Sequence, residues 1–198
     1  ISINPGKVVT EIENLSKNYG DNKVLSDVNL LIERKSKIAF VGQNGQGKST
    51  LAKIMVGELK PSSGNSKLGH NVQIGYFAQN QAEYLDGSKT VLQTMIDSAN
   101  ETNRSKVRDV LGSFLFKGDD VEKYVRVLSG GERNRLALAK LLLQPFNVLV
   151  MDEPTSHLDI KSKSVLKQAL VKFDGTLILV SHDRDFLQNI TNKVYEFK

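Results

Sequence analysis

Residues 40–50 read FVGQNGQGKST, and they contain the phosphate-binding pattern G-x-x-x-x-G-K-[ST], filled by Gly42, Gly47, Lys48 and Ser49. A short apolar run before the pattern predicts a buried strand, and the segment after it predicts a helix. In this strand–loop–helix setting, the glycines let the backbone curl so that successive N–H groups face phosphate oxygens. Lys48 would reach the β- and γ-phosphates, and the Ser49 hydroxyl could ligate Mg²⁺.

The composition is that of a globular protein large enough for one sizeable α/β domain, with 198 residues, 39% hydrophobic and 25% charged. There is no cysteine, which excludes a disulfide framework and a thiolate metal site and fits the reducing cytoplasm. No stretch approaches the roughly 20 apolar residues of a membrane span, and the first residues are not a signal peptide. The net charge of +5 permits an anionic partner such as nucleic acid without requiring one. Because an initiator Met is absent, we expect a processed, trimmed or excised chain.

Strands and helices alternate along much of the chain, which predicts an α/β fold with a mostly parallel sheet core. Before the phosphate-binding loop, residues 8–14 and 24–33 alternate around the turn YGDNK and predict an antiparallel β portion. After the loop we expect a helix over 48–59, a strand over 72–78, and helical segments between 88 and 125, the last of them over 120–125. A helix from the Ser-Gly-Gly turn at 129 and a strand over 147–151 follow. The chain then ends with a helix over 162–172, a strand over 176–180, a helix over 184–189 and a strand formed by the last residues. We therefore expect a core of residues 1–79 and 127–198 with a small helical lobe at about 80–126.

Two further strand ends carry polar side chains, Asp152 with Glu153 after one buried run and His182 after the next. In an open α/β sheet, ligands bind beyond the carboxyl ends of the strands. Asp152 would therefore hold Mg²⁺, and Glu153 could polarise an attacking water. His182 could stabilise the transition-state charge or orient that water. The alternatives are an acidic pair that caps the turn at Pro154, and a histidine that only donates a structural hydrogen bond.

The segment LSGGE, residues 128–132, predicts a second helix start that could bind an anion. Ser129 would cap the helix, and the two glycines leave the backbone accessible. Both helix starts could contact one nucleotide only if two copies, or two halves, face each other.

Together these motifs make the chain resemble the nucleotide-binding domain of an ABC ATPase. GQNGQGKST matches the Walker A motif of that family, VLVMDEP the Walker B strand, LSGGE the family signature, and SHLD at residues 156–159 the D-loop. By the same resemblance, Gln79 in GYFAQN is the Q-loop glutamine, Tyr19 in KNYG is the aromatic that stacks on adenine, and His182 is the switch histidine. The motifs stand in the family's order and cover almost the whole chain.

Within that family the chain is most similar to the ABC-F group, in its segments LSGGERNRLALAKLLL, DEPTSHLDI and SHDRDFL. It departs from the usual patterns at Gln43, where many ABC domains have Pro, and at Ser156, where ABC-F proteins usually have Asn. ABC-F proteins carry two cassettes, and KLGHNVQIGYFAQNQ resembles the second, C-terminal one. The 49 residues between Gln79 and Ser129 leave room for a compact helical lobe only.

The resemblance implies an ATPase half-site that closes head-to-tail with a second cassette, in the same chain or a homodimer, and acts on ribosome-bound tRNA or rRNA. Lys48, Glu153 and His182 would act in catalysis, and Ser49, Gln79 and Asp152 would hold Mg²⁺. The residues expected to contact ATP are Tyr19, Gly42, Gln43, Asn44, Gly45, Gln46, Gly47, Lys48, Ser49, Thr50 and Gln79, with Ser129, Gly130, Gly131 and Glu132 contacting the ATP of the opposing cassette.

Two other functions remain open at this point. One is the ATPase subunit of a membrane transporter, which would dock a membrane partner through the helical lobe. The other is a regulatory ATP-binding module without turnover, which the presence of both Glu153 and His182 disfavours. The expected cassette is cytoplasmic, does not insert into a membrane, and hydrolyses ATP weakly when isolated.

Overall fold

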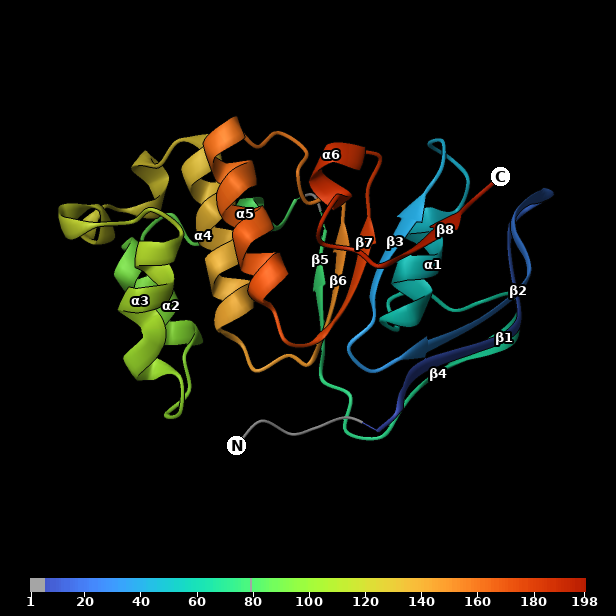
Figure 1. Cartoon of the computed structure of the whole chain (residues 1–198). Coiled ribbons are helices and arrows are strands. Elements are labelled where there is room, and N and C mark those ends of the chain that lie inside the picture. The colour runs from blue at the N-terminus through green and yellow to red at the C-terminus, as the bar shows by residue number, and fades with distance from the viewer. Residues whose placement is uncertain (1–5, 79) are drawn as a thin grey trace. The chain divides into compact units, whose positions relative to one another are not determined.

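The computed structural model describes residues 6–78 and 80–198, and its fold is α/β as the sequence predicts (Figure 1). The chain divides into two compact units. Unit 1 comprises Ile1–Tyr76, Phe146–Pro154 and Phe173–Lys198, and unit 2 comprises Phe77–Pro145 and Thr155–Lys172. The predicted helical lobe falls within unit 2, which also takes in two later helices; the division into one core and one lobe stays a prediction.

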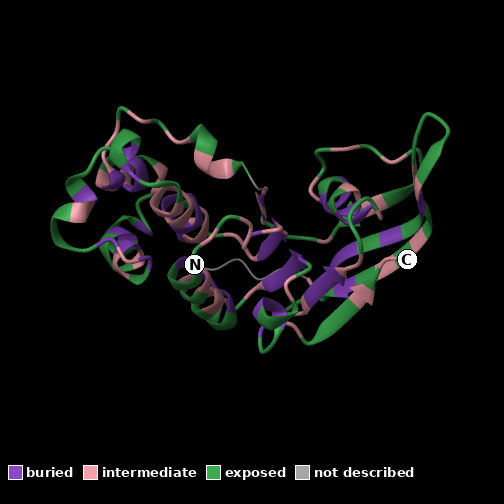
Figure 2. Cartoon of the chain, turned by 90° about the horizontal axis from the view of Figure 1, so that it is seen from above, coloured by how far each residue is buried: buried purple, intermediate pink, exposed green. Residues whose placement is uncertain are grey.

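Unit 1 is built around a five-stranded sheet, and its buried segments lie along the strands (Figure 2). The strand order is β5 (Ile74–Phe77), β6 (Val148–Asp152), β7 (Thr176–Val180), β3 (Lys37–Val41) and β8 (Lys193–Glu196). The pairs β6–β7, β7–β3 and β3–β8 are parallel. Every residue of β7 is buried, which is why its sequence reads as a continuous apolar run. The parallel direction brings the carboxyl ends of β3, β6 and β7 to one edge of the sheet.

A second sheet of unit 1 is antiparallel, in the order β2 (Asn22–Glu33), β1 (Val8–Tyr19) and β4 (Ser63–Leu68). The predicted first strand thus continues to Tyr19, through an irregular register. Strand β4 was missed because its sequence, SGNSKL, has no apolar alternation. Pairing with β1 gives it a strand conformation that its own residues do not favour.

Helix α1 (Lys48–Met55) follows the phosphate-binding loop and packs into the core between the two sheets of unit 1. The prediction that it reaches residue 59 is wrong. Gly57 has a φ of 83°, and its N–H donates to the Ile54 carbonyl at 3.1 Å. A glycine in this left-handed conformation ends the helix early.

Unit 2 is helical. Its elements are the 3₁₀ turn η1 (Gln81–Tyr84), α2 (Val91–Ser98), η2 (Arg104–Lys106), α3 (Val107–Ser113), η3 (Gly118–Glu122), η4 (Val125–Val127), α4 (Gly130–Leu143) and α5 (Ile160–Lys172). The predicted helix over 120–125 is therefore wrong, because extended backbone at Lys123 and Tyr124 separates two short turns. Helix α4 packs against α2, α3 and α5.

Two helices have bounds that differ from the prediction because of their caps. Helix α5 begins at Ile160 rather than at residue 162, since the Asp159 carboxylate accepts a hydrogen bond from the Ser162 N–H at 2.6 Å. In unit 1, α6 (Arg184–Leu187) ends before Gln188, which is extended. No helix formed by the described residues is both long and apolar enough to span a bilayer.

Candidate nucleotide-binding site

The phosphate-binding loop connects β3 to α1, and its backbone requires glycine at two positions. Gly47, immediately before α1, has a φ of 85°, and an added Cβ there would lie 2.7 Å from the Leu25 side chain. Gly42 has a φ of 144°, and an added Cβ would lie 2.6 Å from both the Gln46 side-chain oxygen and the Phe197 carbonyl. The loop is therefore packed on both sides by β2 and by the chain after β8, which fixes its curvature.

Lys48 lies across its own loop. Its Nζ donates hydrogen bonds to the carbonyl oxygens of Gly42 at 2.8 Å and Gln43 at 2.6 Å. The residue is only 5% exposed, so its charge is directed into the loop rather than into solvent. An ammonium held at the mouth of a backbone cradle is well placed to meet an entering phosphate.

A cavity of about 350 Å³ brings some of the predicted site residues of unit 1 together, but Tyr19, Gly42, Gln43, Gln46, Asp152 and His182 do not line it. It is lined by Asn22, Val24, Asn44, Gly45, Gly47, Lys48, Ser49, Thr50 and Glu153. No side chain caps the first turn of α1, so the helix N–H groups at this cavity are left for a ligand. The cavity thus combines helix N–H groups, a cation and two hydroxyls with one carboxylate, a set suited to a phosphate chain and a water.

Asp152 ends β6, and its Oδ1 atom is buried without a hydrogen-bond partner among the described residues. The other oxygen, Oδ2, lies 3.5 Å from the Tyr76 hydroxyl of β5. Burial, followed by the negative charge of Asp152, raises the pKa of Tyr76, so this phenol stays protonated and can donate.

An unpaired buried carboxylate oxygen at the end of β6, a strand that packs against α1, fits Mg²⁺. In the described ranges no three His, Cys, Asp or Glu side chains cluster as a metal site. Magnesium bound through a hydroxyl, one carboxylate and phosphate oxygens needs no such cluster.

Glu153 and His182 are brought together at the ends of β6 and β7. The His182 Nδ1 lies 3.0 Å from the Glu153 Oε1, and since a carboxylate only accepts, Nδ1 carries the proton. Glu153 has a φ of 47°, and its own N–H donates to the Val180 carbonyl at 2.8 Å. This left-handed conformation turns the Glu153 side chain toward the phosphate cavity, which it lines. His182 also lines a neighbouring cavity with Gly42 and Gln43.

Tyr19 is 49% exposed at the end of β1, and the Lys17 Nζ lies 5.2 Å from its ring centre. Tyr19 pairs with Asn22 across the hairpin of β1 and β2, and Asn22 lines the phosphate cavity. The tyrosine ring therefore lies near that cavity. An exposed ring in that position is available for stacking. Gln79 lies outside the described residues.

The Ser-Gly-Gly turn belongs to unit 2. Ser129 caps α4: its hydroxyl accepts from the Glu132 N–H at 3.2 Å, and the Glu132 carboxylate accepts from the Ser129 N–H at 2.8 Å. Gly130 and Gly131 occupy the first helical turn. Glu132, predicted to contact nucleotide, is thus engaged with the cap.

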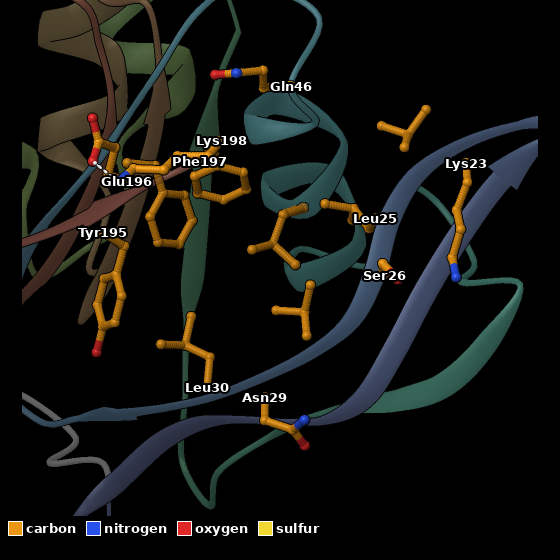
Figure 3. Close-up of a pocket in the computed structure, with 14 residues that line it drawn as sticks. Lys23, Leu25, Ser26, Asn29, Leu30, Gln46, Tyr195, Glu196, Phe197 and Lys198 are labelled. Atoms are coloured by element: carbon orange, nitrogen blue, oxygen red, sulfur yellow. Dashed lines mark ion pairs between the residues drawn. The ribbon is translucent and has the colours of Figure 1, made fainter.

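Sequence reasoning missed several residues near the loop. Asn22 and Val24 line the phosphate cavity, and only their place directly after Tyr19 could have indicated this. A second cavity beside the loop has a volume of about 400 Å³. It is lined by Gln46 and by the rings of Tyr195 and Phe197, which Figure 3 shows. Its aliphatic residues come from β2 and from Leu51 of α1, and none of them belongs to the phosphate-binding pattern.

Comparison with known proteins places these features in context. A family model described as ABC transporter matches residues 25–156. Over 96% of this chain, "ABC transporter F family member 5" of Arabidopsis thaliana is 46% identical and the "Putative ATP-binding protein YdiF" of Bacillus subtilis is 47% identical. The "ATP-binding protein Uup" of Haemophilus influenzae is 43% identical over 98% of the chain. The chain spans 28%, 30% and 30% of the lengths of these relatives.

A solved structure described as "Structure of ATP binding subunit of ABC transporter" has the same fold. The TM-score is 0.82, and the match covers 96% of this chain and 85% of the other at 19% identity.

Proposed function

Since the chain belongs to the ABC transporter family and has relatives in the ABC-F group, we propose that it is one half of a two-cassette ATPase. It is an ATP-binding cassette of a family that in general hydrolyses ATP. In the proposed function, it closes head-to-tail on a second cassette when ATP is bound and opens after hydrolysis. The observation that carries the proposal is the phosphate cavity, where Lys48 and Ser49 face the same space as Glu153.

Binding begins at the loop. The phosphate chain occupies the cradle of N–H groups at residues 42–50, and Lys48 exchanges its two carbonyl partners for phosphate oxygens. Tyr19 stacks on adenine at the hairpin end. The Ser49 hydroxyl and Asp152, with Gln79, would hold Mg²⁺, which would neutralise charge on the phosphates.

Glu153 is the general base in this proposal. Its carboxylate accepts the proton of the attacking water, and His182 fixes that carboxylate through its Nδ1–H. Because the Glu153 Oε1 is bonded to His182, the other oxygen, Oε2, is the one that accepts the proton of the water. A second cassette excludes bulk water and presents its own Ser129 turn, Gly130, Gly131 and Glu132 to the γ-phosphate.

In the longer protein, this ATP-dependent closure would act on the ribosome and its bound tRNA or rRNA, in the cytoplasm. Identities of 46% and 47% to relatives, one of which is named for the F family, favour the ABC-F group, and the transporter structure at 19% identity supports the fold alone. The isolated cassette should turn over ATP slowly, with a rate per molecule that rises with protein concentration.

The decisive experiment uses the Glu153→Gln variant. Because the base is removed while the cavity is kept, we expect turnover to fall roughly 100-fold or more and ATP affinity to stay within about threefold. Light scattering with ATP should then show a trapped dimer. The matched control is Glu101→Gln, at an exposed residue of unit 2, which should behave as the parent does. Unchanged turnover, or a variant that stays monomeric with ATP, contradicts the proposal.

A further inference from the structure

The starts of α4 and α5 meet at one carboxylate in unit 2. Asp159, the last residue of the SHLD segment (residues 156–159), accepts the Ser162 N–H on its Oδ1 at 2.6 Å and so caps α5. A Cβ added to Gly131 would lie 3.3 Å from the Asp159 Oδ2. The same carboxylate therefore lies close to the first turn of α4, at Gly131.

A second connection runs from α4 back to α5. The Arg135 Nη1, in the second turn of α4, donates to the Ser162 hydroxyl at 3.0 Å. Ser162 is only 1% exposed, so this hydrogen bond is shielded from solvent. The Arg135 guanidinium also lies 5.6 Å from the Phe116 ring, which holds the plane of the group in place.

Electrostatics support the same arrangement. Hydrogen bonds from the backbone and the side chain of Ser162, followed by the positive charge of Arg135, hold the pKa of Asp159 below its ordinary value. Asp159 therefore remains a carboxylate at neutral pH. Hydrogen bonds connect Arg135 to Ser162 and Ser162 to Asp159, whose carboxylate lies close to Gly131 on the same helix as Arg135.

We propose that Arg135 and Ser162 are positioning residues that hold the SHLD segment against the Ser-Gly-Gly turn, so that both meet the opposing cassette as one rigid element. This inference rests on the proposed function, in which the turn contacts the nucleotide of that cassette. Helices α4 and α5 lie side by side (Figure 1), but the SHLD segment between β6 and α5 is irregular. His157 in it has a φ of 62°.

The physical reason is the entropy of association. An irregular segment that must become ordered on binding weakens the complex, whereas a segment already held in its bound conformation does not. The path through Ser162 and Arg135 orders the SHLD segment before the second cassette arrives. Neither residue lines the phosphate cavity, so their loss should leave ATP binding by the monomer intact.

The test introduces Ser162→Ala into the Glu153→Gln background. We expect the dissociation constant of the ATP-dependent dimer to rise about tenfold to a hundredfold, the effect of one shielded hydrogen bond to a charged group. The monomer's affinity for a fluorescent ATP analogue should stay within about twofold. Ser164→Ala, at an exposed serine two residues along α5, is the matched control and should change neither value.

A double-mutant cycle with Arg135→Met separates positioning from general destabilisation. Since Ser162 and Arg135 act along one path, the double variant should dimerise about as weakly as the worse single variant. Additive effects overturn the inference.

Amide exchange on the monomer keeps the inference separate from the proposed function. In the Ser162→Ala variant, exchange over residues 155–159 and 129–133 should both accelerate relative to Ser164→Ala. If the Glu153→Gln parent fails to dimerise with ATP, the two-cassette function fails, and accelerated exchange still supports the positioning role. Unchanged exchange in both segments overturns that role, whatever the parent does.

Discussion

Two helix starts carry the motifs of this chain, and they solve the same chemical problem in opposite ways. The first N–H groups of any α-helix lack partners within the helix. At α1 the preceding residue is Gly47, with a left-handed backbone and no side-chain cap. At α4 the preceding residue is Ser129, which forms a reciprocal cap with Glu132. One start is left open for a ligand, and the other is satisfied by its own chain.

The difference indicates how each start would meet a phosphate. At α1 the N–H groups and Lys48 already surround a cavity, so binding needs no loss of a side-chain cap. At α4 a ligand would have to take over hydrogen bonds that Ser129 and Glu132 now make to each other. Under the proposed function, α1 is the primary binding site, and α4 contributes weakly and reversibly when cassettes close.

The largest effect is expected from a substitution at the start of α1, which no side chain caps. Lys48→Ala removes the cation that lines the phosphate cavity, and we expect ATP affinity of the isolated chain to fall roughly 100-fold. Calorimetric titration with ATP measures this directly. The control is Lys53→Ala, an exposed lysine of the same helix, which should retain the parent affinity. If Ser129→Ala weakens ATP binding by the monomer as much as Lys48→Ala does, the distinction between the two starts is wrong.

The open start could be predicted from the sequence because its function depends on local residues. Gly42, Gly47 and Lys48 occupy one turn of chain, and the strand and helix around them follow from apolar periodicity. The apolar runs that form β6 and β7 likewise predicted that Asp152 and His182 lie at the ends of buried strands. The α/β fold class is confirmed for the same reason.

What could not be predicted depends on contacts between distant residues. Strand β4 exists through its pairing with β1, and nothing in SGNSKL favours a strand. The link from Arg135 to Ser162 joins residues 27 positions apart, each unremarkable in sequence. Gly57 by itself indicates the early end of α1, but the helical pattern of the sequence continues past it and predicts a longer helix.

A smaller effect is expected at the start of α4, which Ser129 and Glu132 cap. Ser129→Ala removes the hydroxyl that accepts the Glu132 N–H, and we expect it to lower the free energy of unfolding by about 1 kcal/mol. Ser129→Gly should lower it by only a few tenths of a kcal/mol, because glycine leaves the N–H accessible to water. Urea unfolding of both variants measures the difference. Equal losses would mean that the cap observed at α4 adds nothing to stability.

The same contrast extends to two carboxylates, and it gives the smallest expected effect. Asp152 has an unpartnered buried oxygen in the part of the chain that the structure describes, whereas the carboxylate of Asp97 in unit 2 is bonded to Lys89 at 2.7 Å and to Gln93. The hydrogen bond from Lys89, followed by that from Gln93, lowers the pKa of Asp97.

A lowered pKa in the folded state adds stability that is present above the unfolded pKa, about 3.9, and is lost as pH falls from there through the folded pKa. Asp97→Asn should therefore lower the urea midpoint slightly at about pH 6 and by less at about pH 3, because the stabilisation is being lost below the unfolded pKa. Asp119→Asn, at an exposed carboxylate of the same unit, is the control. If Asp97→Asn lowers the urea midpoint equally at both pH values, the effect comes from packing and not from the hydrogen-bonded charge of Asp97.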